Sequence, residues 1–229
     1  GRLWAALAAS VLIGLLVWWW RNGGPILAML GLALASWVIL GAITNLLARA
    51  SFASVGWRVG LRRLFGLPSS AFGTAFGHAG LGLTLLGVIA TTSFQSETIV
   101  EMKPGDRQTV GRYEISFDGL RAEKGANYRA TVAAMTVRQD GVEQFQLAPS
   151  KRTFLTRSMP TTEAAIRNHG FSQLYVTLGD SGQTPGSIIV RMWDKPLVTL
   201  IWLGALAMMA GGALSLTDRR LRVGAPKPA

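Results

Sequence analysis

The side chain with the clearest potential for chemistry is a histidine in an otherwise apolar segment. His78 lies within Ser69–Ala90, which contains no other ionisable residue. An imidazole in the membrane interior is costly unless something binds it, and imidazole is the commonest metal ligand in proteins. From chemistry alone, two roles for His78 are open: a metal ligand, or a packing residue hydrogen-bonded to a neighbouring helix.

One metal chemistry fits a single buried histidine in a span. This is axial coordination of haem iron, with the opposite ligand supplied by another helix. A flat, apolar porphyrin also suits a surface of phenylalanine, leucine and glycine. The only other histidine, His169, lies in a polar region before Gly170, as at a helix end or a turn. The second axial ligand would therefore come from other sequence or another subunit, or be absent.

Other familiar catalytic patterns are missing from the sequence. Cysteine is absent, which excludes disulfides, thiolate metal sites and cysteine nucleophiles. The sequence also lacks a phosphate-binding glycine loop, a histidine pair at metal-binding spacing and a nucleophile elbow. We assign no catalytic residue. A basic cluster of Lys151, Arg152 and Arg157 fits either an anionic partner, such as a propionate, or a solvated strand face.

The elements that position His78 are membrane spans. Hydrophobic residues make up 49% of the 229 residues and gather in four blocks, which is typical of a membrane protein. We expect two transmembrane helices in 1–48, a third at 71–92 that carries His78, and a fourth at 196–217. Because the chain begins at Gly1 and shows no signal-peptide cleavage pattern, we expect it to be a piece of a longer polytopic protein.

The distribution of charge predicts the topology. The net charge is +11, but residues 93–195 hold 13 basic and 11 acidic side chains, so most of the excess lies beside the apolar blocks. Basic clusters there mark cytoplasmic segments, which we place at the loop 49–70 and the tail 218–229. Part of the loop is expected to lie as an interfacial helix. This distribution argues against nucleic-acid binding.

The long polar region at 93–195 has the pattern of β structure. Tyr113–Phe117 alternates between apolar and polar residues, and Gln139–Gly141 is a turn signal between two strand-like runs. We expect one short helix at Thr161–Asn168. The predicted fold class is thus an α-helical transmembrane bundle of four spans plus one antiparallel β-rich domain, a barrel or sandwich. This domain would lie opposite the basic loop, in the periplasm.

The order of these parts resembles the C-terminal third of CcmF, the haem lyase subunit of the cytochrome c-type biogenesis system. The segments that carry the resemblance span nearly the whole chain. They are Phe76–Gly80, Met102–Asp106, Asn127–Ala130, Pro149–Arg152, Met159–Ile166, Leu174–Gly179, Lys195–Pro196 and Ser215–Arg220.

The resemblance implies a function in the bacterial inner membrane. In that family, haem delivered by the periplasmic haem chaperone CcmE is joined to the cysteines of apocytochrome c, with CcmH/CcmI as assembly subunits. A separate haem b lies within the membrane, and His78 occupies the position of one of its two axial histidines. The family's tryptophan-rich motif and periplasmic histidine pair do not appear here. Trp18–Trp20 lacks the motif's glycine and aspartate, so we do not equate them.

Two functional hypotheses follow. In the first, this chain is part of a haem lyase and His78 is an axial ligand of haem b, although the chain alone would be inactive. In the alternative, it is a non-catalytic, membrane-anchored module whose β domain docks cytochrome assembly partners, and His78 is a packing residue.

Overall fold

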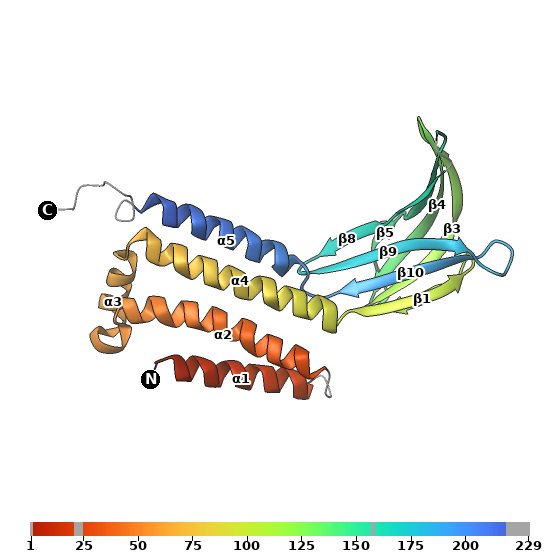
Figure 1. The fold of residues 1–229 in the computed structure, drawn as a ribbon. Helices are drawn as coiled ribbons and strands as arrows, with labels where there is room; N and C mark the ends of the chain where they lie inside the picture. Colours follow the sequence, from red (N-terminus) through yellow and green to blue (C-terminus); the bar gives the residue numbers. More distant parts are fainter. Residues whose placement is uncertain (1, 21–24, 157–158, 219–229) are drawn as a thin grey trace. The chain divides into compact units, whose positions relative to one another are not determined.

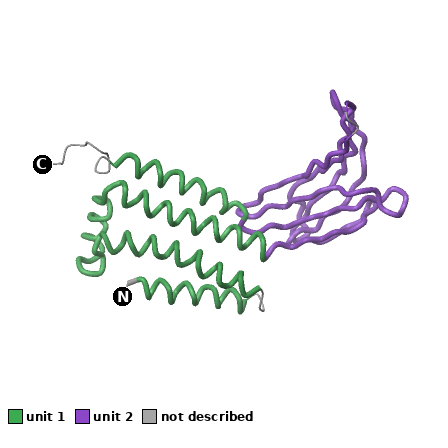
Figure 2. The backbone as a smooth tube through the Cα atoms, in the orientation of Figure 1, with its two compact units in different colours: residues 1–93, 198–229 green, residues 94–197 purple. Residues whose placement is uncertain are grey.

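The computed structural model describes residues 2–20, 25–156 and 159–218. The chain divides into two compact units, shown in different colours in Figure 2. We call residues 1–93 with 198–229 the helical unit and residues 94–197 the β unit.

Five helices form the described part of the helical unit (Figure 1). They are α1 (Arg2–Trp20), α2 (Ile26–Arg49), α3 (Phe52–Phe65), α4 (Ser69–Ser93) and α5 (Thr199–Thr217). All except α3 are long and apolar enough to cross a membrane, which confirms the four predicted spans. Helix α4 packs against both α2 and α5, and α1 packs against α2.

Small residues and one carboxylate hold α4 against α5. A Cβ placed on Gly73 would lie 2.6 Å from the carbonyl oxygen of Gly211, so the two backbones are in direct contact there. The buried side chain of Asp218, which follows α5, accepts a hydrogen bond of 3.2 Å from the backbone N–H of Ser70. A carboxylate is favourable at this position because the first turn of a helix has free N–H groups and a positive dipole end.

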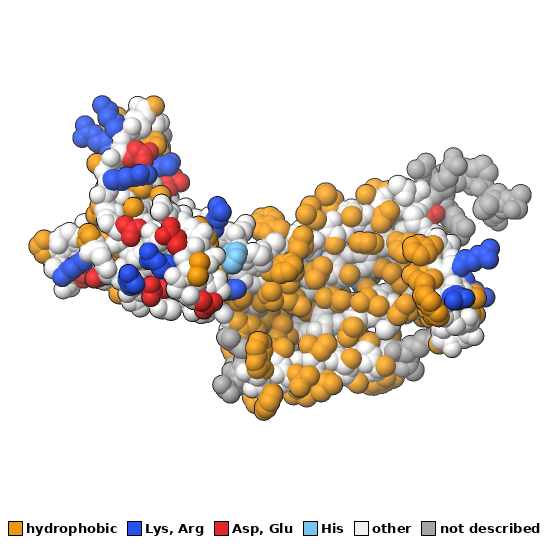
Figure 3. Space-filling view, turned by 180° about the vertical axis from the view of Figure 1, so that it is seen from behind, with side chains coloured by type: hydrophobic (Ala, Val, Ile, Leu, Met, Phe, Trp, Pro, Cys, Tyr) orange, Lys and Arg blue, Asp and Glu red, His pale blue; other side chains and the backbone are white. Residues whose placement is uncertain are grey.

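The predicted basic loop 49–70 is largely helical, as helix α3. The chain enters it through Ser51 in the left-handed conformation (φ 59°), and the helix is kinked at Gly56 (φ 76°, ψ 165°). The arginines at 58, 62 and 63 are exposed. Figure 3 shows Lys and Arg side chains gathered at one end of the helical unit, whose visible face is otherwise mostly hydrophobic.

The described residues of the β unit form ten antiparallel strands in two sheets. The first sheet has the order β1-β10-β9-β8. The second has the order β2-β3-β4-β6-β7, with β5 also paired to β4. The strands are β1 (Ser96–Met102), β2 (Arg107–Val110), β3 (Tyr113–Lys124), β4 (Tyr128–Gln139), β5 (Val142–Leu147), β6 (Ser150–Phe154), β7 (Pro160–Glu163), β8 (Ala165–His169), β9 (Ser172–Ser181) and β10 (Ile188–Lys195).

The core of the β unit is formed by side chains from both sheets. The largest fully buried ones include Met102, Tyr113, Phe117, Leu174 and Met192. Alternate residues point inward along β9 and β10, as expected where one face of a sheet packs on a core and the other meets solvent. The predicted antiparallel β-rich domain is therefore confirmed, in the form of a sandwich.

One predicted element is wrong. Thr161–Asn168 is not a helix, because residues 160–163 form β7 and residues 165–169 form β8. β7 pairs with β6, with Ser150 opposite Glu163, and β8 pairs with β9. Ala164 and Ala165 have high helix propensity, whereas Thr161, Thr162 and Ile166 are β-branched and favour strands that have a partner. The turn at Asp140–Gly141 is confirmed, with positive φ at both residues.

Candidate functional site

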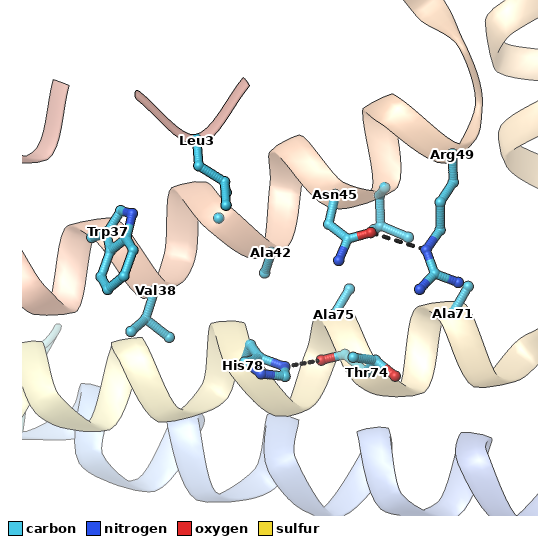
Figure 4. A pocket seen from close by; sticks show the side chains of 12 residues that line it. Leu3, Trp37, Val38, Ala42, Asn45, Arg49, Ala71, Thr74, Ala75 and His78 are labelled. Carbon is cyan, nitrogen blue, oxygen red and sulfur yellow. Dashed lines mark hydrogen bonds between the residues drawn. The ribbon is translucent and has the colours of Figure 1, made fainter. Parts of the chain in front are cut away.

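His78 projects from the first half of α4 with its ring oriented by its own helix. Its Nδ1 lies 2.8 Å from the backbone carbonyl oxygen of Thr74, one turn earlier (Figure 4). A carbonyl oxygen can only accept, so Nδ1 carries a proton, and in the neutral form of the ring Nε2 then has the lone pair. Nε2 has no hydrogen-bond partner among the described residues. A backbone carbonyl can fix the second nitrogen of a metal-binding histidine in this way, and the same bond also satisfies a histidine that only packs in a helix bundle.

The His78 side chain lines a groove between α1, α2 and α4, with a volume of about 220 Å³ (Figure 4). Its walls are mainly apolar: Trp37 and Val38 come from α2, and Ala71 and Ala75 come from α4. Gly41 of α2 also lines the groove, and a Cβ placed there would meet nothing within 4 Å. We call this feature the His78 groove.

The polar side chains of the His78 groove include a fixed arginine. Arg49, at the end of α2, donates from Nε to Oδ1 of Asn45 over 2.9 Å, and both residues line the groove. From the sequence, Arg49 belongs to the predicted basic loop 49–70, and no role is assigned to Asn45. The signal that could have joined them is their separation by four residues, which puts both side chains on one face of a helix.

The residues that line the groove would suit a tetrapyrrole better than a bare metal ion. Among the residues that the structure describes, no group of three or more His, Cys, Asp or Glu is placed to hold a metal. One oriented imidazole, apolar walls and a nearby cation are instead features that suit haem. His78 would supply one axial bond, and Arg49 is the nearby cation.

His169 is part of the β unit and has a structural partner. It ends strand β8, before Gly170 in the left-handed conformation (φ 61°), so the predicted helix end is wrong and the predicted turn is confirmed. Its Nδ1 lies 3.1 Å from the hydroxyl oxygen of the buried Tyr113. Burial raises the pKa of the Tyr113 hydroxyl, which keeps it neutral and able to donate to the imidazole.

An ion pair that was not predicted from the sequence lies close to His169. Arg112, in the turn between β2 and β3, donates from Nε to Oδ2 of Asp194 in β10 over 3.2 Å. It also donates from Nη2 to the hydroxyl of Ser172 over 2.6 Å. These bonds tie the turn between two strands of the second sheet to the first sheet. No local signal marks the pair, because 82 residues separate the two partners.

The predicted basic cluster of the β unit is engaged with acidic residues. Lys151 Nζ lies 2.5 Å from Oδ1 of Asp180 and lowers the pKa of that carboxyl group. Arg152 lies 3.5 Å from Glu163 and stacks over the ring of Tyr128. Arg157 lies outside the described residues. The two described cations thus favour the solvated strand face over a site for an anionic partner.

Comparisons with known proteins identify the family. Residues 93–196 match the family model described as the CcmF C-terminal beta-sandwich. The cytochrome c-type biogenesis protein CycK of Rhizobium meliloti is 53% identical over 98% of this chain, and the match covers 33% of CycK. The chain belongs to the CcmF family. The CcmF of Escherichia coli is 33% identical over 95% of this chain, which aligns with 32% of that protein.

A solved structure supports the fold of this CcmF-family chain. The structure titled Cytochrome c Heme Lyase CcmF matches with a TM-score of 0.69 and 21% identity, covering 94% of this chain and 34% of that one. The chain spans about a third of the length of the curated relatives it matches. Its family and its four membrane-length helices make it a multi-pass membrane protein.

Proposed function

We propose that this chain is part of a cytochrome c haem lyase, in which the His78 groove holds a membrane haem b. The observation that carries the proposal is the hydrogen bond between His78 Nδ1 and the Thr74 carbonyl oxygen, which leaves Nε2 free to bind iron. His78 is proposed as one axial ligand of the iron. The second ligand would come from a residue outside the described part of this chain.

The chain's own residues would give the groove its properties. The Thr74 carbonyl fixes the ring angle and the tautomer of His78, and the apolar walls would pack against the bound group. Because the sequence has no cysteine, a haem in this chain is held without thioether bonds, as in b-type proteins. When bound, such a group supplies a one-electron redox centre, which would keep delivered haem reduced.

We further propose that the β unit lies in the periplasm and meets the assembly partners there. Basic segments mark cytoplasmic loops, and the arginines of α3 are exposed on the loop that the charge pattern assigns to the cytoplasm. The β unit follows α4 and precedes α5, so it belongs to the opposite side of the inner membrane. The haem chaperone CcmE, the subunits CcmH/CcmI and apocytochrome c are the partners that the family implies.

A second candidate function is a docking module without bound haem. Its support is the β unit itself, which has its own core and would present a rigid surface without any contribution from His78. In that case His78 would be a packing residue, and its hydrogen bond to the Thr74 carbonyl oxygen would be enough to satisfy the ring.

The absorption spectrum of the full-length gene product distinguishes the two functions. We expect a b-type Soret band that is lost or shifted in His78→Ala and retained in Val88→Ala, a control on the same helix outside the groove. An unchanged spectrum in His78→Ala would remove the haem assignment. Cytochrome maturation that survives deletion of the β unit would count against the docking module.

A further inference from the structure

We propose that Arg49 binds a propionate of the haem, so that the ligand of the His78 groove lies with its carboxylates toward the Arg49 end. This inference rests on the proposed function and adds an orientation to it. It follows from three observations: the fixed guanidinium, its place in the groove, and the lack of an acidic partner in the described chain.

The guanidinium of Arg49 is held in one position with most of its donors available. Nε donates to Asn45 Oδ1 over 2.9 Å, which fixes the plane of the group and leaves the two Nη atoms with their four N–H bonds. In Figure 4 the Arg49 group lies beside Ala71, at the opposite end of the groove from Trp37. Two N–H groups side by side match the two oxygens of a carboxylate.

The spacing along the groove separates a metal-ligating end from a carboxylate-binding end. Ala71 and His78 are seven residues apart on α4, which is about 10 Å along a helix axis. The segment between them contributes Thr74 and Ala75 to the groove lining. An extended, mostly apolar ligand with carboxylates at one edge therefore meets the imidazole, the apolar wall and the cation in turn.

Charge supports the same assignment. No ion pair of Arg49 with an acidic side chain is found among the described residues, and Asn45 is neutral. A cation at the edge of the hydrocarbon layer is stabilised by a counter-ion or by reaching the headgroups. An arginine that only reaches the headgroups has no need of a side-chain partner that fixes its plane. The hydrogen bond to Asn45 orients the guanidinium plane of Arg49, so that its two Nη atoms can bind a planar, bidentate ligand.

The test compares haem with its dimethyl ester, in which both propionates are blocked. Full-length protein freed of haem in detergent is titrated with each compound, and binding is followed by the Soret band. In the wild type we expect haem to bind about tenfold more tightly than the ester, as one charge-assisted pair would give. In Arg49→Gln the ratio falls to about one through a loss of haem affinity. Arg62→Gln, on the exposed side of α3, keeps the wild-type ratio.

Two further variants make each outcome decisive. Arg49→Lys keeps the charge without the planar fork, so a ratio between those of the wild type and Arg49→Gln supports the bidentate contact. A ratio that is unchanged in both Arg49 variants overturns the inference, and the proposed function stands if His78→Ala still removes the ligation signal. If His78→Ala leaves the spectrum unchanged, the proposed function falls. If the ratio of haem affinity to ester affinity still falls in Arg49→Gln in that case, Arg49 binds a carboxylate at a site where His78 does not ligate iron.

Discussion

Gly80 of α4 and Gly204 of α5 lie backbone to backbone. A Cβ placed on Gly80 would lie 2.6 Å from the carbonyl oxygen of Gly204, and a Cβ on Gly204 would lie 2.5 Å from that of Gly80. This contact is two turns along α4 from the contact of Gly73 with Gly211. The two helices therefore meet along a stripe of small residues, and the helix that carries His78 is fixed on that side.

We expect Gly80→Ala to destabilise the helical unit by about 1–3 kcal/mol, because the new methyl group has no space between the two backbones. Gly77→Ala is the matched control on the same helix, since a Cβ there would meet nothing within 4 Å. Thermal unfolding of both variants in detergent measures the difference. Equal midpoints for the two would show that the α4–α5 contact is looser than the structure describes.

Filling the His78 groove from α2 should remove haem without unfolding the chain. Gly41 lines the groove and has open space at its Cβ position, so Gly41→Leu would extend into the volume that the ligand needs. We expect the haem content of the full-length protein to fall several-fold while the unfolding temperature stays within a few degrees. Gly212→Leu on α5, also in open space but outside the groove, is the control. Full haem content in Gly41→Leu would place the ligand elsewhere.

The ion pair between Arg112 and Asp194 should matter more than the exposed pairs of the β unit. The Asp194 side chain is 9% exposed, whereas Arg107 and Glu114, which are 3.5 Å apart, are 63% and 43% exposed. We expect Arg112→Ala to cost about 2–3 kcal/mol, because it leaves a buried carboxylate without its partner. Arg107→Ala should cost less than about 1 kcal/mol. Denaturant unfolding gives both values, and similar costs for the two would contradict the prediction.

The sequence predicted local features well and long-range pairings poorly. The four spans and the Asp140–Gly141 turn follow from hydropathy and turn chemistry, which act over a few residues. The helix assigned to 161–168 was wrong because its strands exist only through pairing with β6 and β9. The order of the strands in the two sheets has the same non-local origin.

The candidate site shows the same division. His78 was identifiable as a lone imidazole in an apolar segment, but its bond to the Thr74 carbonyl depends on a rotamer that the sequence does not specify. The groove requires α1, α2 and α4 to pack together, so Gly41 and Arg49 gained a common role only in the structure. The sequence alone predicted His78 as a candidate ligand, but the residues that form the groove around it were identified only from the structure.

The carboxylate of Glu101 should stabilise the loop between β9 and β10 in a pH-dependent way. Its carboxylate accepts hydrogen bonds from the Ser187 hydroxyl and from the backbone N–H of Thr184, and these bonds lower its pKa from 4.5 to about 2. A lowered pKa in the folded state means that the ionised form stabilises the fold. The contribution is fully present above pH 4.5 and is lost as the pH falls through about 2.

Hydrogen exchange of the Thr184 backbone amide measures this stabilisation of the loop directly. Exchange rates are first corrected for the intrinsic rate at each pH. At pH 5 and above, we expect the Thr184 amide to exchange more slowly in the wild type than in Glu101→Gln, because the variant accepts the same bonds without a charge. The difference should shrink as the pH approaches 2. Glu123→Gln, on the exposed end of β3, should match the wild type throughout. A difference between wild type and Glu101→Gln that is constant from pH 2 to pH 5 would mean that the charge of Glu101 does not hold the loop, since the other carboxyl groups titrate in both proteins and only Glu101 differs between them.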